Sequence, residues 1–289
     1  MSFGANIPAR NAAIFAGVLL LVIGLGLGMR ATDADGVAAE VVQPAGKTPK
    51  PSCPTPKKKN DPTYQPPASK VCQAIGEVTG LQKLANGERN PYKIPSDGRI
   101  VAFGVSLSKP SSEERAFFTD APDTGPSVED GVGWGEPSVK LSIVKKLKHQ
   151  RFKLVKQSVK VSVTHELGRN PIFTLKKPLK VKAGLFVAIT TGNWMPALAH
   201  DPPAAEANKD QWLASRGSKH CGNAPAGSSV EEQIAAQQDA IDHSKPHNKV
   251  GSVRSYACTY TAARLLYRAY FVPNSGDGSG GGGGGTGQN

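Results

Sequence analysis

The 289-residue sequence has few cysteines, few aromatic residues and no compact catalytic motif. Four cysteines are too few for a disulfide-dense mini-protein, and the 32 glycines follow no collagen-like repeat. The sequence contains no G-x-S-x-G nucleophile motif, no G-x-x-x-x-G-K-[ST] phosphate loop and no H-E-x-x-H zinc motif. We therefore predict a non-catalytic protein, and a hydrolase whose site is dispersed along the chain stays open as a minor alternative.

Only one long apolar run is present, at residues 11–29 between Arg10 and Arg30. A single run excludes a multi-pass membrane protein, and a helix of about 19 residues spans about 28 Å, close to the thickness of a bilayer's hydrocarbon core. We predict an uncleaved signal anchor, a transmembrane helix that follows a short cytoplasmic N-terminus at residues 1–10. The alternatives are a cleaved signal peptide, which would give a secreted protein, and a buried core helix.

Composition divides the rest of the chain into a folded part and two flanking segments. Residues 31–69 carry repeated prolines and three consecutive lysines at 57–59, which favour an extended basic linker over a packed core. Residues 274–289 are mostly glycine and predict a disordered tail. Residues 70–273 are long enough to bury a sizeable core as one domain.

Short segments in which apolar and polar residues alternate dominate the folded part, as is typical of half-buried strands. Such strands with turn residues between them predict a mainly β fold, a single antiparallel β-sandwich. Residues 109–137 and 200–254 break the rhythm and are expected as loops. The exception is a helix that begins at a capping box of Ser229 and Glu232 and ends before Pro246. The predicted strands are residues 99–108, 138–144, 152–155, 158–164, 171–175, 179–181, 185–191, 256–261 and 264–272.

Three short motifs carry a family resemblance. They are PSDGRI at residues 95–100, PLKVKAG at residues 178–184 and RLLYRA at residues 264–269. In this order they resemble motifs of the uncharacterised extracytoplasmic β-sandwich proteins of GC-rich actinobacteria. The resemblance implies a jelly-roll-like sandwich on the cell exterior, and it brings no known activity.

Cysteines outside the cytosol form disulfides by default. We predict a bridge between Cys221 and Cys258, which bracket the later part of the 200–254 segment, whereas the pairing of Cys53 and Cys72 stays open. The alternative is a zinc site. The absence of C-x-x-C and the position of Pro246 disfavour it, so the sequence predicts no metal. The zinc ligands in that alternative would come from His220, Cys221, His243, His247 and Cys258.

Positive charge is concentrated in one stretch. Residues 140–182 hold thirteen Lys or Arg and one acid, Glu166, so this stretch alone carries +12, the formal net charge of the whole chain. Period-two alternation predicts four lysines on the outer face of one sheet. The plain interpretation is a solvated face whose lysines protect strand edges. The functional interpretation is a surface that binds an anionic envelope polymer or lipid headgroups. The four are Lys140, Lys160, Lys180 and Lys182.

Aromatic residues offer a second interpretation. Trp134, Trp194 and Trp212 lie in or beside predicted loops, where a tryptophan, Trp194 above all, can stack on a sugar ring. More often such a side chain packs into the interior. The basic stretch contains only Phe152 and Phe173 as aromatics, and single-stranded nucleic acid needs repeated stacking platforms, so we expect no nucleic-acid partner.

These patterns together predict a single-pass, membrane-anchored protein whose C-terminal domain lies outside the cell. Its expected role is non-catalytic binding or structure, through the basic face to an anionic envelope polymer. The alternative is a carbohydrate-binding module that uses Trp194. No cofactor is expected.

Overall fold

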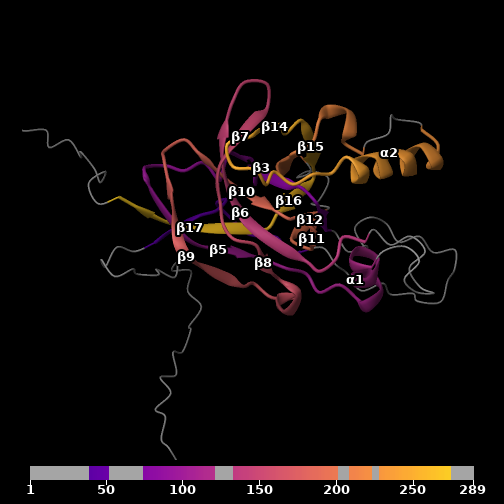
Figure 1. Ribbon diagram of the computed structural model, residues 1–289, viewed down its shortest axis with the longest axis horizontal. Coiled ribbons are helices and arrows are strands. Elements are labelled where there is room, and N and C mark those ends of the chain that lie inside the picture. The colour runs from indigo at the N-terminus through magenta and orange to yellow at the C-terminus, as the bar shows by residue number, and fades with distance from the viewer. Residues whose placement is uncertain (1–38, 52–73, 121–132, 201–207, 223–227, 275–289) are drawn as a thin grey trace, which may run out of the picture.

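The computed structural model describes residues 39–51, 74–120, 133–200, 208–222 and 228–274 (Figure 1). This part is mainly β, as predicted. Its helices are α1 (Ser112–Thr119) and α2 (Val230–Asp242), and the short 3₁₀ helices include η2 (Thr164–Glu166) and η4 (Ser218–His220). The strands are β1 (Glu40–Val42), β2 (Ile75–Gly76), β3 (Thr79–Ala85), β4 (Glu88–Arg89), β5 (Gly98–Val105), β6 (Ser138–Lys146), β7 (Arg151–Gln157), β8 (Val161–Ser162), β9 (Ile172–Val181), β10 (Phe186–Thr190), β11 (Trp194–Met195), β12 (Leu198–His200), β13 (Gln211–Ala214), β14 (Val253–Ser255), β15 (Cys258–Thr261), β16 (Ala263–Leu265) and β17 (Tyr267–Pro273).

Two antiparallel sheets contain most of these strands. The smaller sheet has the order β1-β17-β5-β9, and the larger sheet has the order β14-β7-β6-β10-β3-β13-β15, with β4 beside β3 and β8 beside β6. Two short antiparallel ladders pair β2 with β11 and β12 with β16. This arrangement is compatible with a β-sandwich. Both helices lie at one end of the molecule, at the right in Figure 1.

The main core lies between the two sheets. The smaller sheet contributes Ile100, Phe103 and Phe271, and the larger sheet contributes Leu141 and Val187, all fully buried in one cluster. Successive side chains of a strand point to opposite faces, so these residues alternate with others that face away from the core. Burying one side chain of this size contributes about 1.5–3 kcal/mol, which makes this layer the main source of stability.

The strand predicted at residues 158–164 is confirmed only at the two residues of β8. β7 ends just before Ser158, and β8 contains only two residues. The Ser158 N–H donates to the Leu141 carbonyl at 2.8 Å, and the Ser158 hydroxyl oxygen accepts from the Leu141 N–H at 2.9 Å. A side chain that takes a backbone donor interrupts the ladder at that point. Val159 is consequently 76% exposed, although the alternation places it inside.

Other boundaries also differ from the prediction. Residues 171–175 and 179–181 form one strand, β9, and residues 264–272 divide between β16 and β17. Residues Glu40–Val42, inside the predicted linker, form β1 and pair with β17. Strands β3 and β13 are missed because their sequences do not alternate strictly.

Both helices begin at capping boxes. In α2 the Ser229 hydroxyl accepts from the Glu232 N–H and the Glu232 carboxylate accepts from the Ser229 N–H, as predicted. Ser111 and Glu114 do the same for α1, which lies in a segment predicted as a loop. Helix α1 has no buried residue, so it lacks the apolar stripe that would reveal it in the sequence.

No helix within the described ranges is long and apolar enough to cross a membrane. The predicted anchor at residues 11–29 and the glycine-rich tail at 275–289 lie outside the described residues, as do Cys53 and Cys72. The anchor therefore stays a prediction.

The larger sheet is buried on its outer face as well. Residues 244–257, here named the covering segment, cross this face, and β14 within them pairs with β7. Tyr256 of this segment packs with Phe152, Phe186 and Leu213 in a second buried cluster. Burial on both faces explains the nearly continuous apolar sequence of β10.

A row of hydroxyl groups crosses the larger sheet beneath the covering segment. The Thr190 hydroxyl lies 2.7 Å from that of Thr79 and 2.6 Å from that of Ser142. The backbone N–H of His247 donates to the Thr79 hydroxyl at 2.9 Å, and the buried His247 ring lies 3.1 Å from the Tyr256 hydroxyl. Buried polar groups need such partners, so this row fixes the covering segment on the sheet.

Burial lowers the pKa of His247 below its ordinary value of 6.5. Below about pH 6.5 the unfolded chain binds a proton that the folded chain does not yet bind. The free energy of unfolding therefore decreases as the pH is lowered. We predict that His247→Gln reduces this loss between about pH 7.5 and 5.5, measured by urea unfolding, while His165→Gln, at an exposed histidine, retains it. Equal pH dependence in wild type and His247→Gln would contradict this cause.

Candidate functional site

The four predicted lysines do not share one sheet face. Lys140 lies in β6 of the larger sheet, and Lys160 lies in the loop between β7 and β8. Lys180 lies in β9 of the smaller sheet, and Lys182 follows it. The prediction of one basic face is therefore wrong, because the chain crosses from the larger sheet to the smaller one before β9.

Local contacts also engage these lysines. Lys140 Nζ donates to Asn248 Oδ1 at 2.9 Å, and burial, followed by the nearby Lys160 charge, lowers the pKa of Lys140. Lys182 Nζ lies 2.7 Å from the Asp97 carboxylate. Lys180 is exposed on β9, an edge strand, where a lysine opposes the addition of a further strand. These positions fit the interpretation that the lysines are solvated surface residues that protect strand edges.

A denser group of cations lies at the hairpin of β6 and β7. Lys145 and Lys153 stand directly opposite each other in the ladder, an arrangement that is unfavourable for like charges. Strand β7 is flanked by β6 and β14, so protection of an open edge does not explain it. Within the described ranges, no salt bridge neutralises the hairpin cations. The exposed cations of residues 145–153, with no acid among them, are Lys145, Lys146, Lys148, Arg151 and Lys153.

This hairpin borders a hollow on the outer face of the larger sheet. The hollow has a volume of about 120 Å³, and its apolar floor includes Phe152 and Phe186. Three cations line it from separate strands, Lys83 of β3, Arg89 of β4 and Lys146 of β6. No acid of the described chain lines it. We name this site the basic hollow.

Two hairpin turns bring the three cations together. Asn86 and Gly87 connect β3 to β4 with φ of 52° and 81°, the turn geometry that Asn-Gly favours between twisted strands. His149 and Gln150 connect β6 to β7 with φ of 55° and 53°. The Asn-Gly pair is a sequence signal that identifies the first hairpin. No sequence pattern indicates that Lys83 and Arg89 line the basic hollow, because both lie outside the basic stretch at residues 140–182.

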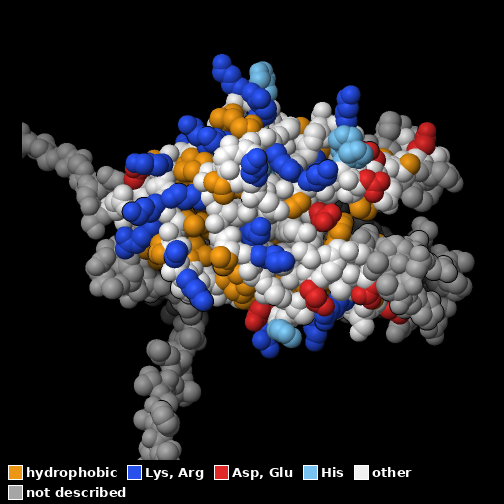
Figure 2. Space-filling view, viewed as in Figure 1, with side chains coloured by type: hydrophobic (Ala, Val, Ile, Leu, Met, Phe, Trp, Pro, Cys, Tyr) orange, Lys and Arg blue, Asp and Glu red, His pale blue; other side chains and the backbone are white. Residues whose placement is uncertain are grey.

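Charge is unevenly distributed over the surface. Figure 2 shows Lys and Arg side chains over most of the visible face, and Asp and Glu side chains mainly toward the end that bears α1 and α2. There the Arg115 guanidinium binds the Glu136 carboxylate at 2.8 Å. On this face the acidic side chains therefore offset the positive charge mainly at the end that bears the helices.

The alternative in which Trp194 stacks on a sugar is wrong, and the interpretation that such a tryptophan packs into the interior is confirmed for Trp194. The Trp194 side chain is fully buried, its ring stacks on Phe118, and its Nε1 donates to the Gly135 carbonyl at 2.8 Å. Trp134 is half-buried instead, and its ring lies against the backbone of Gly76. A Cβ at residue 76 would come within 2.1 Å of that ring, so this contact requires glycine.

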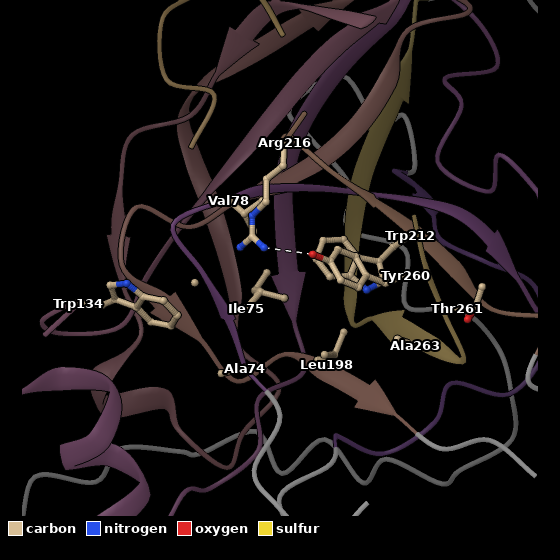
Figure 3. Close-up of a pocket in the computed structure, with 11 residues that line it drawn as sticks. Ala74, Ile75, Val78, Trp134, Leu198, Trp212, Arg216, Tyr260, Thr261 and Ala263 are labelled. Carbon is tan, nitrogen blue, oxygen red and sulfur yellow. Dashed lines mark hydrogen bonds between the residues drawn. The ribbon is translucent and has the colours of Figure 1, made fainter. Parts of the chain in front are cut away.

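Trp134 lines a second, larger cavity of about 280 Å³. Trp212 and Tyr260 stack on each other at its other side, with ring centroids 4.6 Å apart. Figure 3 shows Arg216 pointing into the space between Trp134 and Tyr260. We name this site the aromatic cavity.

Hydrogen bonds hold Arg216 in that position. Its Nη2 donates to Ser244 Oγ at 2.6 Å. Its Nη1 donates to the Tyr260 hydroxyl at 3.1 Å, the bond drawn in Figure 3. No carboxylate of the described residues forms an ion pair with it. The guanidinium charge is therefore not neutralised by a described carboxylate, and it lies in a cavity lined by the rings of Trp134, Trp212 and Tyr260.

The predicted disulfide between Cys221 and Cys258 is confirmed, with Cα atoms 5.1 Å apart. It closes a loop of 37 residues, for which chain entropy gives a stabilisation of about 3–4 kcal/mol. The disulfide also removes both thiolates from the five-residue zinc alternative. His247 is separately buried beside Tyr256, so that ligand set does not assemble.

Comparisons with known proteins identify no family for this chain. No protein-family model, curated protein or solved structure matches this chain. The resemblance carried by residues 95–100, 178–184 and 264–269 therefore stays a prediction, and the function has to be inferred from the chemistry of the sites.

Proposed function

We propose that this chain is an extracytoplasmic, non-catalytic binding protein whose basic hollow binds an anionic polymer of the cell envelope. The observation that carries the proposal is the convergence of Lys83, Arg89 and Lys146 around one apolar floor. Cations held together in a concave site focus positive potential on a bound phosphate, carboxylate or sulfate group.

The surroundings of the hollow favour a polymer over a small anion. Lys145, Lys148, Arg151 and Lys153 continue the positive charge along the adjoining hairpin. Salt screens exposed charges beyond about 8–10 Å, so a single anion feels only the nearest cations. A chain with regularly spaced anionic groups contacts the hollow and the hairpin at once, and its binding energy adds over several contacts.

The disulfide between Cys221 and Cys258 supports a location outside the cytosol, because such bonds persist in oxidising compartments. We further propose that the two sheets form a jelly-roll-like sandwich. In this proposal the apolar run at residues 11–29 is a single-pass anchor, which holds the domain at the outer surface of the membrane.

The test compares two variants that lose the same charge. Lys83→Gln/Arg89→Gln/Lys146→Gln empties the hollow of cations, and Lys176→Gln/Lys177→Gln/Lys180→Gln removes three exposed cations from β9. We predict that the hollow variant binds immobilised long-chain polyphosphate about tenfold or more weakly at low salt, with a shallower dependence of log K on log salt concentration. The β9 variant should change affinity by less than about twofold.

Two results would contradict the proposal. Equal losses in both variants would mean that net charge alone determines binding. Binding that ignores salt would mean that the contact is not electrostatic. Vesicles containing anionic lipid form a second arm, and stronger salt-sensitive binding to vesicles than to polymer would assign the hollow to the membrane surface instead.

The aromatic cavity favours a second candidate function, recognition of an acidic sugar. Trp134 and Tyr260 line the cavity with aromatic rings, and Arg216 offers a charge that no described carboxylate neutralises. This candidate keeps the carbohydrate interpretation but moves it from Trp194 to residues of the cavity.

A uronate-containing oligosaccharide tests the second candidate. We predict that it changes the tryptophan fluorescence of the wild type, and that Arg216→Gln weakens its binding about tenfold or more, because a charge-assisted hydrogen bond is lost. Trp134→Phe should remove most of the fluorescence change. A flat fluorescence response in the wild type across acidic and neutral oligosaccharides would eliminate this candidate.

A further inference from the structure

Two histidines and an aspartate converge at a third site, apart from the basic hollow and the aromatic cavity. His220 Nδ1 lies 2.9 Å from Asp239 Oδ2, and His243 Nδ1 lies 3.0 Å from Asp239 Oδ1. The two imidazole rings stack with centroids 3.8 Å apart. One donor atom of each residue lies within 4.8 Å of the donors of the other two. We name these residues the histidine–aspartate cluster.

Helix α2 positions two members of the cluster. Asp239 and His243 are four residues apart and lie on the same side of the helix end. The chain after α2 is fixed to the core, because Ser244 is buried and its hydroxyl donates to the Gly76 carbonyl at 3.2 Å. Arg216 donates to the same hydroxyl, so the end of the helix has little freedom to move.

The disulfide positions the third member. His220 ends η4, and the next residue, Cys221, is bonded to Cys258 of β15. The Cys221 carbonyl also accepts a hydrogen bond from the Tyr260 hydroxyl at 2.9 Å. Two constraints on the neighbouring residue thus hold His220 against α2.

The donor set suits a transition metal. Two imidazole nitrogens and one carboxylate oxygen are ligands that Zn²⁺ and similar ions prefer. Tetrahedral bonds of about 2.0 Å separate two ligand atoms by about 3.3 Å, close to the nitrogen–oxygen distances here. The side chains are between one third and one half exposed, so an ion can reach them.

We propose that His220, Asp239 and His243 bind a divalent transition metal ion, with Zn²⁺ as the first candidate. The ion displaces the proton that His220 Nδ1 shares with the Asp239 carboxylate, and the proton that His243 Nδ1 donates to the Asp239 backbone carbonyl beside that carboxylate. Three protein ligands leave a fourth coordination position for water or a ligand group. This site is independent of the anionic-polymer proposal, since no residue is shared with the basic hollow.

The test is a Zn²⁺ titration of the purified chain, prepared without a polyhistidine tag, in competition with a chromophoric chelator. We expect one equivalent to bind per chain, and each of His220→Ala, Asp239→Asn and His243→Ala to weaken binding about tenfold or more. His165→Ala, which removes an exposed histidine outside the cluster, is the matched control and should bind like the wild type. Co²⁺ substitution adds a visible absorption band that reports the ligand set.

Two outcomes would overturn the proposal. A wild type that binds Zn²⁺ no better than His220→Ala, Asp239→Asn and His243→Ala would show that the cluster is only hydrogen-bonded. An equal loss in His165→Ala would show adventitious binding. Cys221→Ser/Cys258→Ser keeps all three ligands, and we expect it to weaken Zn²⁺ binding; unchanged affinity would overturn the positioning role of the disulfide.

Discussion

The attachment of the covering segment, residues 244–257, to the outer face of the larger sheet is the constraint on which the other features depend. It buries a hydroxyl row and an apolar cluster that a two-layer sandwich would leave in water. The basic hollow lies at one border of that cluster, where Phe152 and Phe186 form its floor. At the other end Ser244 fixes Arg216 and the end of α2, and thereby the aromatic cavity and the histidine–aspartate cluster.

The sequence predicts those parts of the fold that local physics determines. Alternation identifies β5 and β6, a continuous apolar run identifies β10, and the capping box identifies the start of α2. It fails where a long-range contact overrides the local pattern. Residues 158–164 alternate well, yet the side chain of Ser158 takes a backbone donor from β6 and the ladder is interrupted.

The sites are also hard to predict where long-range contacts bring their residues together. The basic stretch at residues 140–182 contains Lys146, but Lys83 and Arg89 join it only through strand pairing, which alternation does not specify. The sequence beside a turn does not distinguish a buried tryptophan ring from an exposed one, so both interpretations of Trp194 stay open until its burial is known. The disulfide is predicted because few cysteines leave few pairings. The cluster of His220, Asp239 and His243 needs two segments far apart in sequence and leaves no motif.

The central claim is that the basic hollow and the adjoining β6–β7 hairpin, and not the cationic surface of β9, bind the anionic polymer. Amide chemical shifts measured during a titration with polyphosphate test it most directly, because they locate contacts residue by residue. The account predicts the largest changes at Lys83, Arg89 and Lys146 and along the β6–β7 hairpin, with small changes on β9. Changes spread evenly over all exposed lysines, or centred on β9, would contradict it.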